Sequence, residues 1–291
     1  MQIKESLGEK VFNLFNIFIM LVLVFLTLYP FWYVIVGSLS NGNRLLQHSG
    51  ALFLPLGFDL AAYKLTFQNQ MLLRSYLNTA FIVVVGTFFN LVMTSLGAYF
   101  LSRKDVMLKK IIMFGIVFTM YFNGGLIPFY LTVKQLHLDN TIWALIIPNL
   151  MSTFNLIIMR TSFMSIPDSL EESAKLDGAS HFTILTRIVI PLSGPVISVM
   201  ALYYGVGHWN SWFNASIFLR KRELFPLSLI LREILLQNTN ADTNNTLIDQ
   251  EAVSHTIKYA LIIVATVPIL CVYPFLQKYF VKGAMVGALK E

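Results

Sequence analysis

The segment Glu172-Ser173-Ala174-Lys175-Leu176-Asp177-Gly178-Ala179 and, after eight intervening residues, Ile188-Val189-Ile190-Pro191 say most about the fold of this chain. The segment is polar and amphipathic, and it lies between two apolar stretches that are each long enough to cross a membrane. Pro167 and Asp168 can open a short helix, and Gly178 permits a sharp turn before a second helix begins from Ala179. Two short helices joined at a glycine form a compact knob, which we expect another protein to hold.

The composition predicts an all-α, polytopic membrane protein. Hydrophobic residues make up 56% of the 291 residues and charged residues only 12%, whereas roughly a quarter of a typical soluble domain is charged. A transmembrane helix needs about 20 predominantly apolar residues, and such stretches recur along the chain. The six predicted transmembrane helices span residues 12–36, 76–101, 111–133, 141–162, 195–219 and 257–281.

The lysines and arginines near the span ends predict the orientation. Short cytoplasmic loops of membrane proteins carry an excess of these residues. The turn from Arg103 to Lys110 holds four cations in eight residues, so we expect this turn and both termini to be cytoplasmic. The net charge of +6 is scattered over loop ends with no aromatic platform among the cations, so we expect no binding to nucleic acid.

We predict a single transmembrane domain over residues 1–291. Residues 1–75 form the first helix and an outer loop, residues 76–281 form the core helices with the loop 163–194, and residues 282–291 form a cytoplasmic tail. Each of the two long outer loops is expected to contain a short helix, one beginning near Asp59 and one over residues 227–236.

The sequence shows no reaction chemistry. It has no phosphate-binding glycine loop that ends in Lys-Ser/Thr. Its five histidines do not lie at the spacing of metal ligands. We therefore expect no catalytic residue, no metal site and no cofactor in this chain, and we expect any ATP hydrolysis to occur on a separate subunit.

The knob segment resembles the EAA motif, E-x-A-x-x-x-G followed by I-x-x-P, of permeases in binding-protein-dependent ATP-binding cassette (ABC) importers. The positions in register are Glu172, Ala174, Gly178, Ile188 and Pro191. The resemblance runs from about residue 76 to the C-terminus, and the chain looks like the carbohydrate-uptake branch, of the maltose-importer second-permease type. Residues 121–128 and 207–214 are similar to the sub-branch for oligosaccharides, alginate or uronate-containing glycans. The chain departs from the motif at Ser173, where alanine is usual, and from the common Lys-Gly ending at its last residue.

This resemblance implies a permease subunit in the bacterial cytoplasmic (inner) membrane that moves a carbohydrate into the cell by alternating access. The implied partners are a dimer of ATPase subunits that holds ATP and Mg²⁺, a second homologous permease, an extracytoplasmic solute-binding protein, the carbohydrate and membrane lipid. The knob would be a cytoplasmic coupling-helix loop that contacts the ATPase through Glu171, Glu172, Ser173, Ala174, Asp177, Gly178, Ala179 and Pro191. A second ATPase contact would come from tail residues Met285, Val286 and Leu289. As alternatives, Glu172 only favours the start of its helix, and the tail is a frayed terminus.

Polar residues in the predicted spans are candidates for the substrate path, because such groups tend to face a cavity or another helix. Amides and flat aromatic faces bind sugars, and the fifth span places Asn210 and Asn214 at i,i+4, and likewise His208 and Trp212. The candidates are His208, Trp209, Asn210, Trp212, Asn214 and Asn123, with Asn149 and Asn155 as weaker ones. The stretch 123–125 would interrupt the third span, either toward a cavity or as a plain kink. It remains open whether these residues instead join helices or lie at the membrane interface.

Two other functional classes compete with the importer. An ion-coupled secondary sugar transporter would need a carboxylate or similar coupling group inside the membrane, and the predicted spans contain no Asp or Glu. A membrane-embedded glycosyltransferase would need catalytic acids beside a donor site, and carboxylates cluster only in the knob. The outer cations at 220–222 and at Arg232 could attract an anionic glycan or a docking protein, or could simply be solvated.

Overall fold

The computed structural model describes residues 6–240, 256–271 and 274. This part of the chain is helical, with an isolated bridge between Ser40 and Phe58 and no strand, which confirms the predicted all-α class. The structure divides into two compact units, residues 1–69 with 233–266 and residues 70–232 with 267–291. That residues 1–291 act as one domain stays a prediction.

The first unit contains α1 (Leu7–Ser38), which extends the first predicted span at both ends. Glu9 N donates a hydrogen bond to Ser6 Oγ, and Ser6 N donates one to the Glu9 carboxylate, so a capping box starts the helix. Most of its apolar side chains are exposed. Its 32 residues are long and apolar enough to cross a membrane.

The segment after α1 folds back on the end of that helix. Leu52 N donates to Tyr29 Oη at 2.9 Å, and Trp32 Nε1 donates to Phe53 O at 3.0 Å. This segment contains α2 (Gly42–Gln47), which was not predicted from the sequence, and α3 (Ala61–Gln68). Ala61 N donates to Asp59 Oδ1 at 2.8 Å, so α3 begins beside the residue that was expected to start it.

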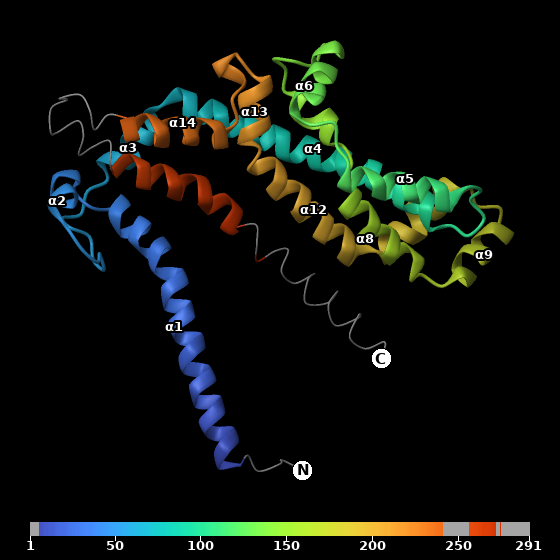
Figure 1. Cartoon of the computed structure of the whole chain (residues 1–291), viewed down its shortest axis with the longest axis horizontal. Coiled ribbons are helices and arrows are strands. Elements are labelled where there is room, and N and C mark those ends of the chain that lie inside the picture. Colours follow the sequence, from blue (N-terminus) through green and yellow to red (C-terminus); the bar gives the residue numbers. More distant parts are fainter. Residues whose placement is uncertain (1–5, 241–255, 272–273, 275–291) are drawn as a thin grey trace. The chain divides into compact units, whose positions relative to one another are not determined.

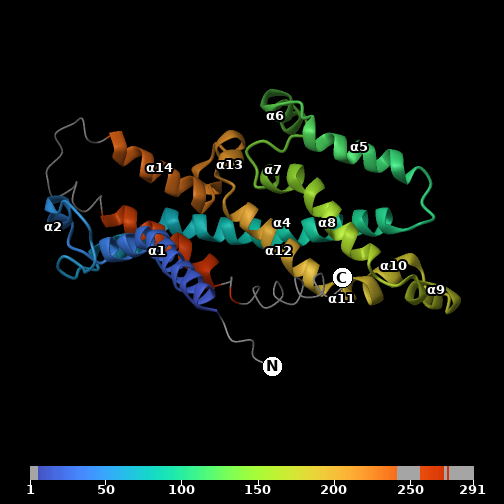
Figure 2. The same cartoon turned by 60° about the horizontal axis from the view of Figure 1, so that its bottom comes forward.

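The second unit is organised around α4 (Gln70–Ser102), which covers the second predicted span. α4 packs against α8 (Thr153–Met164) and α12 (Gly194–Trp209), and the three helices can be followed in Figures 1 and 2. The other elements outside the loop 163–194 are α5 (Lys109–Tyr121), α6 (Leu126–Gln135), α7 (Trp143–Ile146), η1 (Ile147–Asn149), α13 (Trp212–Phe218), η3 (Arg222–Leu224) and α14 (Leu227–Asn240), of which the residues up to Arg232 belong to this unit.

Small and polar residues at four-residue spacing line the face of α4 that meets α8 and α12. The buried stripe consists of Gly86, Asn90, Thr94, Ala98 and Ser102. Residues four apart share one helix face, and small side chains let membrane helices approach closely. The large side chains of Met159, Phe163 and Met200 complete the core beside this stripe.

The third and fourth predicted spans are bent. α5 and α6 meet at 115°, and the α7–η1 segment meets α8 at 50°. The first bend falls at the expected interruption, where Gly125 has a φ of +80° and its N–H donates to Asn123 Oδ1 at 3.0 Å. The prediction of a continuous helix over residues 141–162 was wrong, because Pro148 cannot donate the backbone hydrogen bond that a continuous helix needs.

The fifth predicted span is interrupted between α12 and α13. Asn210 Nδ2 donates to Val206 O at 3.0 Å, and Ser211 Oγ donates to His208 O at 2.8 Å. Side chains that bond to nearby carbonyls in this way compete with helix continuation. A continuous helix over residues 195–219, on which Asn210 and Asn214, and likewise His208 and Trp212, would share one face, was therefore a wrong prediction, because α12 ends at Trp209 and α13 begins at Trp212.

Among the described residues, α1 and α4 can each cross a membrane, and the number rises to five if each bent helix pair counts as one span. The helix Thr256–Cys271 covers the start of the sixth predicted span. The rest of that span and the tail residues Met285, Val286 and Leu289 lie outside the described residues. The count of six spans stays a prediction.

Candidate functional site

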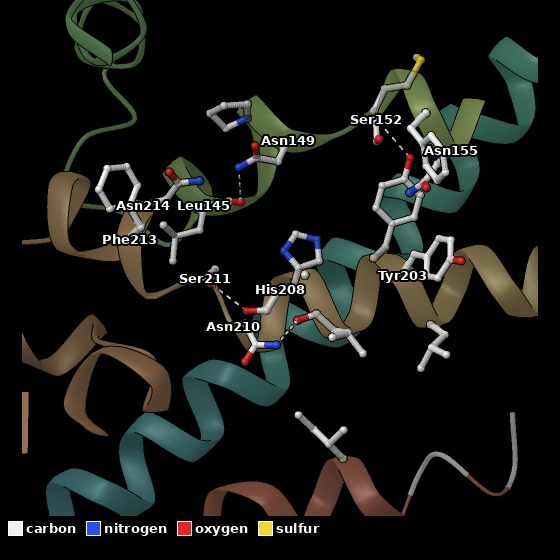
Figure 3. Close-up of a pocket in the computed structure, with 18 residues that line it drawn as sticks. Leu145, Asn149, Ser152, Asn155, Tyr203, His208, Asn210, Ser211, Phe213 and Asn214 are labelled. Carbon is white, nitrogen blue, oxygen red and sulfur yellow. Dashed lines mark hydrogen bonds between the residues drawn. The ribbon is translucent and has the colours of Figure 1, made fainter. Parts of the chain in front are cut away.

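A cavity of about 990 Å³ opens where the helices are broken, between the α7–η1–α8 segment and the α12–α13 segment (Figure 3). Its lining combines aliphatic side chains with amides, hydroxyls and aromatic rings. The amides are Asn149, Asn155, Asn210 and Asn214, the hydroxyls of serine are Ser152 and Ser211, and the aromatic rings include Phe154, Tyr203, Tyr204 and Phe213. This combination suits a ligand with many hydroxyl groups and flat apolar faces.

Side chains of α4 and α12 satisfy backbone groups that the break before α8 leaves free. Asn90 Nδ2 donates to Asn149 O at 2.6 Å, and Ser152 N donates to Tyr204 Oη at 3.1 Å. Unpaired backbone groups are costly inside a membrane, so these bonds stabilise the broken backbone that forms the cavity wall. Thr94 Oγ1 lies 2.7 Å from Tyr204 Oη and extends the same network.

His208 supports this wall from α12. It is buried, and its Nε2–H donates to Asn90 Oδ1 over 2.6 Å, which leaves the Asn90 amide nitrogen free to donate to Asn149 O. A Cβ on Gly86 would lie 2.6 Å from His208 Nε2, so the imidazole fits only against a glycine. His208 lines the cavity, but its ring nitrogen is engaged with α4.

The structure brings some of the predicted path residues together and separates others. Asn210 and Asn214 line the cavity with His208. Trp209 instead faces a separate apolar cavity of about 450 Å³ between α4 and α12. The ring of Trp212 lies 3.9 Å under the Arg232 guanidinium, and Asn123 caps the bend between α5 and α6.

Sequence reasoning missed the aromatic part of the lining. Tyr203, Tyr204, Phe154 and Phe213 come from three helices and meet only because two spans are broken. The adjacent tyrosines in the middle of an apolar span were the available signal, since a buried hydroxyl in a membrane needs a hydrogen-bond partner.

The loop 163–194 has the expected order of helix, glycine turn and helix. It contains α9 (Asp168–Leu176), α10 (His181–Ile184), the π-helical η2 (Leu185–Val189) and α11 (Ile190–Leu192), which includes Pro191. Gly178 has a φ of +79°. Gly178 N donates to Lys175 O at 3.0 Å and Ala179 N donates to Ala174 O at 2.9 Å, which is a Schellman motif that ends α9.

Charged side chains divide between the two faces of α9. Glu171 turns inward, where it pairs with Arg103 and, at 3.1 Å, with Lys175, and its side chain is only 12% exposed. Glu172, Ser173 and Asp177 are exposed, and Ala174 and Ala179 pack against the core. The exposed surface of the loop also presents the apolar side chains of Leu176 and Phe182, so this surface is amphipathic.

A second ion pair, at the surface, also joins the residues just after α4 to α9. Lys104 Nζ donates to Asp168 Oδ2, with side chains that are 82% and 55% exposed. This hydrogen bond and the lysine charge hold the pKa of the Asp168 carboxyl below its usual value, and the carboxylate raises the pKa of Lys104.

Apolar helices, some of them long enough to cross a membrane, surround a cavity lined by apolar and uncharged polar side chains. The described residues contain no group of His, Cys, Asp or Glu that could hold a metal. The chain belongs to the family of binding-protein-dependent transport system inner membrane components, whose model matches residues 93–286. It is therefore an inner-membrane component of a transport system that works with a binding protein, and the resemblance to ABC importer permeases is confirmed.

Similar proteins cover almost the whole chain. Protein LplC of Bacillus subtilis is 42% identical over 285 residues, which are 97% of this chain and 95% of LplC. The polygalacturonan/rhamnogalacturonan transport system permease protein YtcP of the same organism is 38% identical over 97% of this chain and 99% of its own. A solved chain of a bacterial ABC transporter involved in the import of the acidic polysaccharide alginate superposes with a TM-score of 0.88, at 32% identity over 96% of this chain and 100% of that chain.

Proposed function

We propose that this permease carries an oligosaccharide into the cell, as one of two homologous membrane subunits of an ATP-driven importer. The cavity carries the proposal, because amides and hydroxyls bind sugar hydroxyls and aromatic rings stack on sugar faces. The names of YtcP and of the alginate transporter support a carbohydrate, and both substrates named there are acidic. Uronate-containing oligosaccharides are therefore the first substrates to test.

The cavity lining among the described residues contains no Lys, Arg, Asp or Glu. This chain would thus contact hydroxyls and ring faces, and the second permease or the binding protein would recognise any carboxylate. The described lining holds no carboxylate, and its imidazole, His208, is already bonded to Asn90 Oδ1. This argues against an ion-coupled secondary transporter, because such a transporter needs an ionisable coupling group beside its substrate.

The remaining assignments follow from this function. The six spans would place both termini and the loop 163–194 in the cytoplasm, as the cations from Arg103 to Lys110 favour. α9 would be the coupling helix, with Glu172, Leu176 and Phe182 on the surface that meets the ATPase. ATP and Mg²⁺ would bind the ATPase dimer, and the tail residues Met285, Val286 and Leu289 would make a second contact with it.

Reconstitution of the complete importer tests the proposal. The chain would be co-expressed with its second permease and ATPase subunits, and the complex placed in liposomes with the binding protein and labelled uronate or neutral oligosaccharides. We expect uptake that requires both ATP and the binding protein. Uptake that runs on a sodium or proton gradient without ATP would contradict the proposal.

A further inference from the structure

The last turn of α4 is a junction at which four other elements meet. Arg160 Nε of α8 donates to Leu101 O at 2.9 Å, and Lys109 Nζ of α5 donates to Arg103 O at 2.7 Å. Cations at a helix C-terminus satisfy its free carbonyls and interact favourably with the helix dipole. α5 and α8 thereby fix the end of α4 in place.

The same turn also contacts α9 and α10 of the loop 163–194. Arg103 pairs with Glu171 on α9, and the Tyr99 hydroxyl lies 3.2 Å from His181 Nδ1 on α10. The Arg103 guanidinium also lies 4.7 Å over the Tyr99 ring, which links the two contacts. Figure 1 shows α9 at this end of the group formed by α4, α5 and α8.

The Arg103–Glu171 pair differs from the surface pair in its burial. Both of its side chains are 12% exposed, whereas Lys104 and Asp168 are largely exposed. Arg103 Nε and Nη2 also donate to Ser102 Oγ, at 3.0 and 2.9 Å, which fixes the orientation of the guanidinium. A shielded, geometrically fixed ion pair resists displacement, whereas an exposed one contributes little.

Further along the same helix, Asn90 and Thr94 support the cavity wall through Asn149, His208 and Tyr204. α4 runs on from Asn90 to its last residue, Ser102, which directly precedes Arg103, so the two sets of contacts lie about 18 Å apart along a continuous helix. One rigid element therefore contacts both the loop and the cavity wall.

We propose that Tyr99 and Arg103 are positioning residues that fasten α9 and α10 to α4, so that movement of the loop passes through α4 to Asn90 and Thr94 at the cavity wall. This inference rests on the proposed function, because it assigns a route by which ATP hydrolysis on a partner opens and closes the cavity.

The experiment measures the number of sugars imported per ATP hydrolysed by the complete reconstituted importer. The variants are Arg103→Gln, Glu171→Gln, the double variant and Tyr99→Phe, with Lys104→Gln as the matched control on the exposed pair. We expect Arg103→Gln and Glu171→Gln to lower the ratio about five- to tenfold, within the range of mutations along a coupling network. The double variant should be no worse than Arg103→Gln, since that change alone already breaks the pair with Glu171, and Lys104→Gln should stay near wild type.

A merely structural role would lower uptake and ATPase activity together and leave their ratio unchanged. A wild-type ratio in assembled Arg103→Gln or Glu171→Gln complexes, or effects that add in the double variant, would overturn the inference. If no glutamine variant assembles, Tyr99→Phe decides, with a lowered ratio in support and a wild-type ratio against. Failure of the wild-type complex to import sugar with ATP would instead contradict the proposed function.

Discussion

The cavity wall and the junction at the end of α4 are both fastened to the same helix, but by different kinds of contact. Neutral amides and hydroxyls hold the wall, through Asn90, Thr94 and Tyr204. Ion pairs hold the junction, through Arg103 and Glu171. A charged side chain costs much free energy inside a membrane and little at its surface. Substitutions that change side-chain shape should therefore disturb the wall, and substitutions that remove a charge should disturb the junction.

The largest effect is expected in the loop, at Gly178. A Gly178→Val substitution places a β-branched residue at a φ of +79°, which costs about 1–3 kcal/mol of strain and should turn α10 away from α4. We expect sugar uptake to fall at least about tenfold while the protein still inserts into the membrane. Gly115→Ala, in open space within α5, is the control. Wild-type uptake and substrate-stimulated ATPase in Gly178→Val would show that the turn is dispensable.

The shape sensitivity of the wall is tested at Gly86. In Gly86→Ala the new methyl group would lie 2.6 Å from His208 Nε2, so the imidazole must leave Asn90. Overpacking of this kind costs about 1–3 kcal/mol, and we expect a lower unfolding temperature of the purified complex and reduced uptake. Gly205→Ala meets only ordinary contacts, at 3.7 Å or more, and should behave like wild type. Equal unfolding temperatures for Gly86→Ala and Gly205→Ala would refute the close fit of Gly86 against His208.

A smaller effect is expected inside the cavity, and it separates two residues that the sequence ranked alike. Asn210 is exposed on the cavity, whereas the Trp212 ring is already stacked under Arg232. Loss of one hydrogen bond to the sugar should raise the KM of Asn210→Ala roughly two- to tenfold. Trp212→Ala should change the KM less. The reverse order, measured by concentration-dependent uptake, would make the tryptophan the sugar platform.

The smallest effect is expected at the exposed pair. The pKa of Asp168 is depressed by Lys104, so its stabilising contribution is present above the unfolded pKa of about 3.9 and is lost as the pH falls through the lower folded value. The pKa of Lys104 is raised, so its contribution is complete below about 10.4 and is lost as the pH rises through the higher folded value. Coupling should thus be flat from pH 6 to 9 in wild type and in Lys104→Gln. A change in coupling between pH 6 and 9 that occurs in the wild type but not in Lys104→Gln would show that the exposed pair takes part in coupling.

The loop was predictable because its signals are local. Proline, glycine and the cap Ser180 fix α9, the turn and α10 through contacts with near neighbours in sequence. The cavity depends on contacts between distant residues: Asn90 and Asn149 are 59 positions apart, and Tyr204 reaches Ser152 across 52. The inward orientation of the Glu171 side chain likewise depends on Arg103, which lies outside the loop.

The central claim is that the cavity between the broken helices holds the transported sugar. It is tested most directly by replacing the native Cys271 with serine, introducing Asn214→Cys, and measuring the rate of labelling by a membrane-impermeant thiol reagent in the assembled importer. The account predicts that the oligosaccharide, delivered by its binding protein, slows the labelling, whereas a sugar that is not imported leaves the rate unchanged. Equal labelling rates with and without the oligosaccharide, in a complex that imports it, would contradict the claim.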